Sequence, residues 1–515
     1  MTQRSGKPRV LVVLAHFDDS RNPNGRPNFI PQGVGHAVLA GAFDRDRVDV
    51  ALYSEFHSGP LLDERTLSWP DMLVLTGVTS AFDRMRQLAA YVRTKSPGCV
   101  VVAGGPAVRN LPLLSAETFD YACHGDVEEL SEIVAAVYGP DAAAETMEPR
   151  FDLLTWSSPV NYAETSRYCN FRCSFCALTG ERRDYLSYDL GVVERQLRSY
   201  AKRRIVLFVD NNFYGNNRAV FMRKLDMLER LHREGVLPGW VALVTSDFFA
   251  HQGHLDRARR AGCLGLFCGV ESFSPTQLAA YNKRQNLVAP QVELIRSCLE
   301  AGIVFQYGLI FDPAVRALRD MEQELDFVLG CSTIPLPAFL SLTIPLLGTP
   351  HFDEAVASGR FLPDAKLRDM DGFTLLTRPR DGIEAVLPFV RQLAKIEGRG
   401  SDVARHAFGF WRRYRRSLSA RQMVTLLMNS ARLCTPAVLN GRRTGGLQAE
   451  ETLTYVTTTQ PLGPLYRPAF PVADRFAGHF SPTMITDADG ELLPTIAANL
   501  AARRHPPRQP AQVAS

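Results

Sequence analysis

The sequence from Arg167 to Leu178 reads Arg-Tyr-Cys-Asn-Phe-Arg-Cys-Ser-Phe-Cys-Ala-Leu and contains three closely spaced cysteines, Cys169, Cys173 and Cys176. A [4Fe–4S] cluster is normally held by four thiolates, so a Cys-x3-Cys-x2-Cys triplet leaves one iron open to a substrate or cofactor. An open iron suits chemistry better than storage. The triplet therefore predicts an enzyme in which these cysteines hold an iron–sulfur cluster.

The same cysteines fit other kinds of site poorly. A zinc site would need a fourth Cys or His in a second ligand pair, and the next cysteines, Cys263 and Cys268, lie far along the chain in a different setting. Ten cysteines in 515 residues are too few for a disulfide-dense protein, and no secretory leader is recognised before them. We expect the remaining cysteines to be buried thiols that pack as small hydrophobes.

Composition places the chain among ordinary globular proteins. It has 515 residues, of which 46% are hydrophobic and 22% are charged, enough for several domains with sizeable cores. No apolar run approaches the length of a membrane-spanning helix and the first residues are polar, so we expect a cytoplasmic protein without a membrane anchor. A net charge of +4 is too small to indicate nucleic-acid binding.

Residues 1–140 are predicted to form a parallel sheet wrapped by helices, because short apolar runs alternate with helix-like stretches. The expected strands are residues 9–14, 48–53, 72–76 and 99–103. The third ends in Thr76-Gly77, with Ser80 close behind, and the fourth ends in Gly104-Gly105-Pro106. Small residues at the carboxyl ends of neighbouring parallel strands let a large ligand approach the backbone, so we expect a cofactor site there.

Residues 141–350 are predicted to form a second domain of repeated strand and helix, in which polar residues follow the strands. These strand-end residues are Asp210, Asn212, Ser246, Glu271 and Asp312. Barrel-type enzymes place their sites at the carboxyl ends of strands, although a single acid there more often caps a helix or forms a salt bridge. Gln306 and Tyr307 lie within the last apolar run of this series.

The C-terminal part is predicted to be a cap over the second domain. Residues 351–500 read as mainly helical and then turn-rich, and residues 501–515 as a disordered tail. The run from Phe408 to Arg416, FGFWRRYRR, interleaves aromatic residues with arginines. Without a recognisable RNA-binding module, such a run is more often an amphipathic helix that covers a core. We therefore expect no nucleic-acid partner.

The cysteine triplet, with Phe175 before its third cysteine, resembles the radical S-adenosylmethionine (SAM) superfamily, and Gly269-Val270-Glu271-Ser272 resembles its G-x-E-S segment. The resemblance implies a partial (β/α)6 barrel and a [4Fe–4S] cluster whose open iron is chelated by SAM. It also implies an external electron donor such as flavodoxin or ferredoxin. The residues expected to contact SAM are Asp210, Asn212, Ser246 and Glu271, and substrate is expected near Tyr307.

The first domain resembles the cobalamin-binding domain that precedes this barrel in one class of the superfamily. The likeness lies in the Gly-Gly-Pro turn and in residues 125–130, Gly-Asp-Val-Glu-Glu-Leu. It implies a Rossmann-like (flavodoxin-like) α/β fold that binds cobalamin. The residues expected to contact cobalamin are Thr76, Gly77, Ser80, Gly104, Gly105, Pro106, Gly125 and Asp126. A nucleotide-binding flavodoxin-like unit is the competing interpretation, but no G-x-G-x-x-G follows a strand.

One departure from the cobalamin proteins concerns the lower face of the cofactor. The Asp-x-His-x-x-Gly signature, whose histidine binds cobalt in other cobalamin proteins, is absent. We therefore expect cobalt without a protein histidine ligand. Arg65 and Trp69, before the third strand, are candidates by position for the lower face. The alternative is an ordinary surface arginine and a packed tryptophan.

The order of the domains resembles cobalamin-dependent radical SAM methyltransferases, and the details are most similar to the tryptophan 2-C-methyltransferases of thiopeptide antibiotic biosynthesis. That likeness rests on the missing histidine signature, on Ser58-Gly59-Pro60-Leu61, on residues 75–86, and on Glu271 with Tyr307. It implies methylation of L-tryptophan at indole C2 through methylcobalamin, without a 5′-deoxyadenosyl radical. Glu271 and Tyr307 would be catalytic, with Tyr307 as a base beside the indole N–H.

Three other functions fit the same residues. The first is a radical SAM methylase that acts on an sp3 carbon of a secondary metabolite or peptide through a 5′-deoxyadenosyl radical. The second is another radical SAM reaction, such as ring closure, with cobalamin as an electron carrier. The third is a binding or sensing protein without turnover, which the open iron disfavours.

Overall fold

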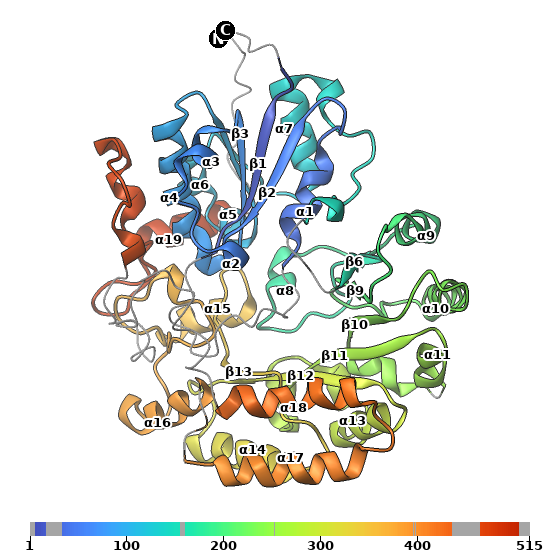
Figure 1. The fold of residues 1–515 in the computed structure, drawn as a ribbon. Helices are drawn as coiled ribbons and strands as arrows, with labels where there is room; N and C mark the ends of the chain where they lie inside the picture. Colours follow the sequence, from blue (N-terminus) through green and yellow to red (C-terminus); the bar gives the residue numbers. More distant parts are fainter. Residues whose placement is uncertain are drawn as a thin grey trace.

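Two parallel sheets, each covered by helices, organise the chain (Figure 1). The computed structural model describes residues 6–16, 33–154, 160–251, 253–394, 396, 398–434 and 464–503. In this part of the chain no helix has the length and apolar character needed to cross a membrane. The predicted tail, residues 501–515, lies outside the described residues from 504 onward.

The first sheet has the order β2-β1-β3-β4-β5 with every pair parallel. Its strands are β1 (Arg9–Leu14), β2 (Asp49–Ser54), β3 (Met72–Thr76), β4 (Val100–Ala103) and β5 (Tyr121–Ala122). Its helices are α1 (Gly35–Leu39), α2 (Glu55–Ser58), α3 (Glu64–Ser68), α4 (Phe82–Lys95), α5 (Pro106–Asn110), α6 (Pro112–Thr118) and α7 (Glu128–Tyr138). This is the doubly wound order in which the winding reverses between β1 and β3, and ligands bind beyond the carboxyl ends of the strands at that point.

Burial on both faces explains why β1 is apolar at nearly every position. Leu11 and Val13 pack in one core of the sheet, while Val10 and Val12 pack in the core on its opposite side. A strand buried on both faces shows a continuous apolar run and not an alternating one. The predicted Rossmann-like sheet is confirmed.

The second sheet has the order β13-β12-β11-β10-β9-β6, again with parallel pairs. Its strands are β6 (Asn161–Ala163), β9 (Val206–Phe208), β10 (Trp240–Val244), β11 (Cys263–Glu271), β12 (Val304–Phe311) and β13 (Phe339–Leu342). Its helices are α9 (Leu190–Ser199), α10 (Arg218–Arg233), α11 (His254–Arg260), α12 (Pro275–Ala280), α13 (Gln291–Glu300) and α14 (Leu318–Gly330). Each strand pairs with its neighbours in the series and β6 is not paired with β13 among the described residues, so the predicted partial barrel is confirmed.

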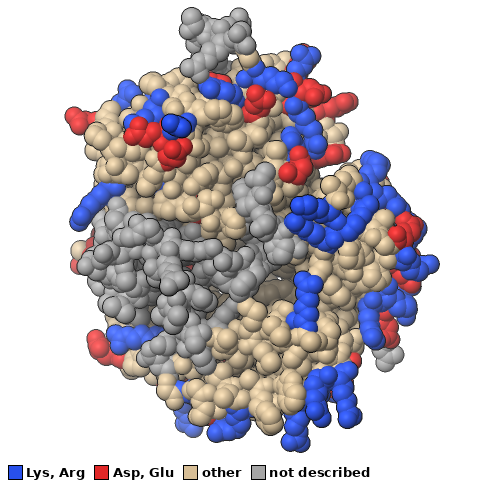
Figure 2. Space-filling view, viewed as in Figure 1, with Lys and Arg blue, Asp and Glu red and all other residues tan. Residues whose placement is uncertain are grey.

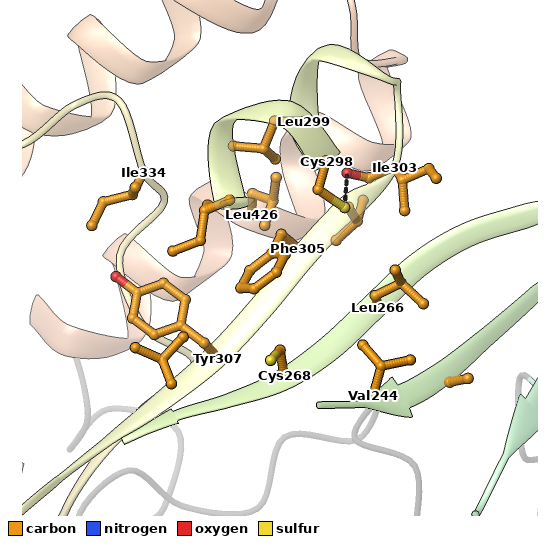
Figure 3. Close-up of a cluster of buried hydrophobic side chains, with 14 of the residues drawn as sticks. Val244, Leu266, Cys268, Cys298, Leu299, Ile303, Phe305, Tyr307, Ile334 and Leu426 are labelled. Carbon is orange, nitrogen blue, oxygen red and sulfur yellow. Dashed lines mark hydrogen bonds between the residues drawn. The ribbon is translucent and has the colours of Figure 1, made fainter. Parts of the chain in front are cut away.

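The two faces of the barrel sheet differ in burial. Leu266, Cys268, Phe305 and Tyr307 belong to the core between the sheet and its outer helices (Figure 3). Several of the alternate residues, such as Phe267, are only half-buried. Helices that follow parallel strands in sequence lie on the outside of a barrel, so the half-buried residues line its inner, concave face.

The C-terminal part returns to both sheets. Helices α15 (Pro350–Ala357), α16 (Ile383–Ala394), α17 (Gly400–Tyr414) and α18 (Ala420–Cys434) are followed by α19 (Pro494–Ala502). Phe389, Phe410 and Leu426 of α16 to α18 pack in the barrel core. Phe476 and Ile496 pack instead in the core of the first sheet.

The aromatic and arginine run of residues 408–416 lies on α17. Phe410 and Tyr414 are buried against the barrel, whereas Phe408 and Trp411 are exposed beside arginines that reach solvent. In Figure 2 positive side chains gather along the lower edge of the molecule, where Figure 1 places α14 and α17. The run therefore forms an amphipathic helix over the barrel, as its pattern predicts.

Candidate active site

The cysteine triplet lies in a loop between two short elements at the barrel's carboxyl side. The antiparallel pair of β7 (Ser166–Arg167) and β8 (Leu186–Ser187) precedes and follows it, and α8 (Ala177–Glu181) begins directly after Cys176. The Cys173 carbonyl accepts hydrogen bonds from the Cys176 N–H at 3.2 Å and the Thr179 hydroxyl at 2.8 Å. The loop is therefore compact before any ligand binds.

The three thiols are close enough to act on one another. Burial raises the pKa of Cys169 and raises that of Cys176 to about 11, and the neighbouring Cys173 contributes to both shifts. The Cys173 sulfur accepts a hydrogen bond from the Gln285 amide at 3.4 Å. In the described residues no three His, Cys, Asp or Glu side chains converge as the ligands of a single metal ion do. A cluster places its thiolates on different irons, and three thiols on one compact loop are a donor set of that kind.

Asp210 fixes the backbone that leads into the cysteine loop. Its carboxylate is fully buried and accepts hydrogen bonds from the Thr165 N–H at 2.9 Å and from the Thr165 and Ser166 hydroxyls. The Lys224 ammonium lies 3.6 Å from the same carboxylate. These hydrogen bonds engage both oxygens of the Asp210 carboxylate. The structure therefore uses Asp210 to position the loop, and neither oxygen is left over to contact SAM.

Asn212 differs from Asp210, because one of its side-chain polar atoms has no hydrogen-bond partner among the described residues. Its side-chain amide donates to the Asn170 oxygen at 2.7 Å, and Asn170 directly follows Cys169. The Asn212 side-chain oxygen is buried and has no hydrogen-bond partner among the described residues. A buried unsatisfied acceptor costs free energy unless a ligand satisfies it. Asn212 is therefore suited to accept a hydrogen bond from SAM.

Glu271 ends β11 in a left-handed conformation, with φ 63°, and faces a lysine. The Lys283 ammonium donates to the Glu271 carboxylate at 2.5 Å and lies 5.7 Å from the Phe175 ring. Burial is the largest influence on Lys283 and lowers its pKa, but the Glu271 carboxylate together with the nearby Cys173 and Cys268 outweighs burial and leaves the pKa raised. The ion pair thus holds the Lys283 ammonium beside the cysteine loop.

Ser246 belongs to a second polar network near the same strand end. Its hydroxyl donates to the Asn286 side-chain oxygen at 3.0 Å, and the Asn286 amide donates to the Gly269 carbonyl at 2.8 Å. Ser246 is buried. The structure thus uses Ser246 to hold the turn after β11.

The predicted catalytic role of Tyr307 is not supported by its position. Tyr307 is fully buried in the outer core of the barrel, and its hydroxyl donates to the Pro335 carbonyl at 2.9 Å (Figure 3). Burial raises the pKa of Tyr307 well above its usual value. A base must reach the proton that it abstracts, and this side chain points away from the concave face.

Glycines shape the carboxyl edge of the first sheet. Gly105 has φ 109°, a conformation that side chains rarely adopt, and a Cβ there would meet the Gly77 carbonyl at 2.9 Å and lie 3.7 Å from the Thr76 hydroxyl. Gly104 comes within 3.4 Å of the Cys123 side chain by the same measure. Pro106 then begins α5 and Ser80 lies in the turn that leads to α4. The glycines thus let neighbouring backbone segments approach closely and add no side chain of their own at this edge.

The two carboxyl edges face each other. Asp126 accepts hydrogen bonds from the Tyr168 hydroxyl and the Arg167 guanidinium, and Tyr168 precedes the first cysteine of the triplet. A second link joins Arg109 of α5 to Glu181 of α8 at 3.1 Å. The adjacent Gly125 donates its N–H to Glu129 at 2.6 Å. The glycine edge and the cysteine loop therefore form one site.

Arg65 and Trp69 lie away from this site. Arg65 is exposed on α3, which leads into the amino end of β3. Trp69 lies under the guanidinium of Arg9, the first residue of β1, at 5.7 Å. Both residues are thus at the amino ends of the strands, opposite the glycine edge, which corrects their predicted place at the cofactor.

The carboxyl edge of β1 and β2 instead carries a buried ion pair. Arg84 and Glu55 are 2.8 Å apart and almost inaccessible to solvent. Glu55 also accepts the N–H groups of His16 at 3.2 Å and Leu61 at 2.8 Å.

Several site residues were not singled out in the sequence. They are Asn170, Lys224, Lys283, Gln285 and Asn286. Lys283, Gln285 and Asn286 lie in or next to the short 3-10 turn Arg284–Leu287, and all three are buried. Their signal was a run of polar residues soon after Glu271, which resembles an ordinary surface turn until its burial is known.

Comparisons with known proteins agree with this geometry. Residues 163–313 match the family model of the radical SAM superfamily. The hopanoid C-2 methylase of Rhodopseudomonas palustris (strain TIE-1) is 25% identical over 381 residues, 69% of each chain. The bacteriochlorophyllide d C-8(2)-methyltransferase of Chlorobaculum tepidum is 24% identical over 327 residues, 56% of this chain and 69% of the relative.

A solved structure also resembles the chain. It is that of the cobalamin-dependent S-adenosylmethionine radical enzyme OxsB with aqua-cobalamin and S-adenosylmethionine bound. The TM-score is 0.49 at 18% identity, and the match covers 64% of this chain and 53% of OxsB, so the chain spans about half the length of that protein.

Residues 163–313 thus match the radical SAM superfamily, and the similarity of the chain to methyltransferases indicates an enzyme of that kind. Enzymes of this superfamily use a [4Fe–4S] cluster and SAM. Cys169, Cys173 and Cys176 fall within this match and would be the donor set for such a cluster, and the buried, unsatisfied oxygen of Asn212 would be placed to accept a hydrogen bond from SAM.

Proposed function

We propose that the protein is a cobalamin-dependent radical SAM C-methyltransferase of a small molecule, with L-tryptophan as the substrate and indole C2 as the acceptor. The observation that carries this proposal is the contact between the glycine edge of the first sheet and the cysteine loop through Asp126 and Tyr168. Two relatives support methyl transfer to carbon, since their names are hopanoid C-2 methylase and bacteriochlorophyllide d C-8(2)-methyltransferase.

Different residues of the chain have different roles in this proposal. When bound, cobalamin supplies a methyl carrier and the cluster supplies an electron. Gly77, Gly104 and Gly105 give the corrin access to the backbone, and the cysteines hold the cluster. Asn212 accepts a hydrogen bond from SAM. Lys283 keeps positive charge beside the loop, which favours the thiolate form of the cysteines. An external donor, flavodoxin or ferredoxin, would deliver the electrons.

Product analysis tests the reaction. Under anaerobic reduction with L-tryptophan and SAM, we expect 2-methyltryptophan and S-adenosylhomocysteine in roughly equal amounts and little 5′-deoxyadenosine, because a polar transfer breaks no C–H bond homolytically. Absence of any tryptophan product with every reductant would discard this substrate and leave the cofactor assignment to be tested separately.

Cobalamin binding is that separate test. The reconstituted protein should retain about one cobalamin per chain, with no protein histidine on cobalt. Electron paramagnetic resonance of the Co(II) form reads the axial ligand directly. Nitrogen superhyperfine splitting that disappears in His16→Ala or His124→Ala, the histidines beside the glycine edge, would contradict the histidine-free assignment.

A second function is favoured by the Glu271–Lys283 contact. Because Lys283 engages the Glu271 carboxylate, that carboxylate is not left to bind the open iron and block reductive cleavage of SAM. This favours methylation of an sp3 carbon of a secondary metabolite or peptide through a 5′-deoxyadenosyl radical. Stoichiometric 5′-deoxyadenosine from the wild-type protein would select it. A gain of 5′-deoxyadenosine only in Glu271→Ala would select the polar reaction instead.

A further inference from the structure

The concave face of the barrel carries a pair of aromatic side chains that is separate from the site residues described above. Phe267 on β11 and Phe339 on β13 have ring centroids 6.0 Å apart and ring planes within 13° of parallel. Phe339 is 41% exposed and Phe267 is half-buried. Large apolar rings that stay uncovered on a concave surface indicate a ligand site. We call Phe267 and Phe339 the aromatic shelf.

Gly308 on the intervening strand β12 makes room for the shelf. It lies opposite Phe339 in the strand register, and a Cβ at Gly308 would overlap the Phe339 ring. Phe267 lies opposite Gln306 on the same strand. The two rings therefore lean over β12 at a position where that strand has no side chain.

The shelf is continuous with the site. Phe267, Gly269 and Glu271 share the half-buried face of β11, and at about 3.3 Å per residue Phe267 lies ~13 Å along the strand from Glu271. The same concave face contacts the first domain, because Leu207 and Val209 pack with its Val34 and Ala37. Figure 2 shows a recess near the middle of the visible face of the molecule. A ligand on the shelf would thus lie on the same face of the barrel as Glu271.

We propose that the aromatic shelf binds a planar aromatic ring of the substrate by stacking and selects planar rings over saturated rings of similar size. This inference rests on the proposed function, because it locates the methyl acceptor of that reaction. Parallel, offset aromatic rings attract one another through their quadrupoles as well as through buried area. A saturated ring can fill the space but lacks the flat π face.

Calorimetric titration of the reconstituted full chain tests the shelf. The probes are L-tryptophan and β-cyclohexyl-L-alanine, which carries a saturated ring. Loss of one stacking partner should weaken tryptophan binding about ten-fold in Phe339→Ala and in Phe267→Ala. Phe339→Leu keeps apolar bulk without the π face and should lose nearly as much. Binding of the saturated probe should change little in Phe339→Leu.

Two further variants separate stacking from general damage. Gly308→Ala keeps both phenylalanines but displaces the Phe339 ring, so it should also weaken tryptophan binding. Phe327→Ala is the matched control, because Phe327 is 43% exposed on α14, on the outer side of the barrel. It should bind tryptophan as the wild type does.

The outcomes distinguish this inference from the proposed function. Unchanged tryptophan binding in folded Phe339→Ala and Phe267→Ala, or equal binding of planar and saturated probes by the wild type, overturns the shelf. Failure of the wild type to bind tryptophan, indole and quinoline also overturns it. Binding that depends on the shelf but yields no methylated product leaves the shelf standing and defeats the proposed reaction. Methylated product formed with an unchanged KM for tryptophan in both alanine variants overturns the shelf and leaves the proposed reaction standing.

Discussion

The two carboxyl edges that meet at the site are built in opposite ways. The edge of the first sheet is backbone at Gly77 and Gly105, which contribute no side chain of their own. The edge of the barrel presents charged side chains, and Asp210 and Glu271 are each held by a lysine. One edge is shaped to receive a large ligand, whereas the other uses its polar groups to fix a loop.

This difference assigns different consequences to substitutions at the two edges. A side chain added to the glycine edge should displace the local turn, and with it the ligand, while the rest of the sheet persists. A polar partner removed from the barrel edge should leave a buried charge unpaired and cost stability. The predictions below test that division.

The largest effect should come from the loop that both edges enclose. Replacing Cys169, Cys173 and Cys176 with alanine should remove the brown cluster absorbance and all turnover, because three thiolates are the protein's entire donor set for the cluster. The fold should persist, since the loop carries ligands and little of the core. Iron and sulfide analysis with circular dichroism measures both. Iron and sulfide at wild-type levels would refute the assignment.

The next largest effect should come from the glycine edge. Gly105→Val places a side chain against the Gly77 carbonyl at a backbone conformation that L-residues rarely adopt, so cobalamin retention on gel filtration should fall about 100-fold or more. Gly98→Val is the matched control, because a Cβ there meets nothing within 4 Å and the residue precedes the amino end of β4. Equal retention by the two variants would show that this edge does not hold the cofactor.

The barrel edge should respond through stability. Asp210→Asn removes the charge that faces the buried Lys224, and breaking such a pair from one side costs about 3–5 kcal/mol. Urea unfolding followed by circular dichroism measures the loss. The double variant Asp210→Asn, Lys224→Met should recover part of it, since no unpaired ammonium remains. If the double variant is no more stable than the single one, the lost hydrogen bonds to Thr165 and Ser166 dominate instead.

Much of the fold was predictable because the decisive patterns are local. The apolar runs of β1 and β3 were predicted at Arg9–Leu14 and Met72–Thr76, the bounds that the structure has, since strands buried on both faces show in sequence as continuous apolar runs. The glycine turns were predicted to gather at the carboxyl edge of the first sheet and the strand-end polar residues at that of the barrel, because the carboxyl ends of parallel strands lie at one edge of their sheet. Arg65 was misplaced because it precedes a strand, and a residue there lies at the amino edge.

Other parts of the site depend on contacts that no local pattern shows. The Asp83 carboxylate of α4 accepts a hydrogen bond from Thr483 across a separation of 400 residues, which is how the C-terminal segment joins the first domain. Lys283 and Asn286 look like surface residues in sequence and are buried only because the turn folds under β11. Both faces of β12 are apolar, so its sequence does not say which residues face the outer helices.

Tyr307 is the case where that ambiguity matters, and it gives the smallest predicted effect. Tyr307→Phe removes a single neutral hydrogen bond to the Pro335 carbonyl and leaves the ring packed against Phe273 and Phe305, so stability should fall by about 1 kcal/mol. Because the hydroxyl points into the outer core, kcat and its pH profile should match the wild type. Single-turnover methyl transfer measures this directly. A slowed transfer with unchanged stability would mean that the hydroxyl reaches the substrate. The assignment of substrate to the concave face of β12, and of packing to its outer face, would then be wrong.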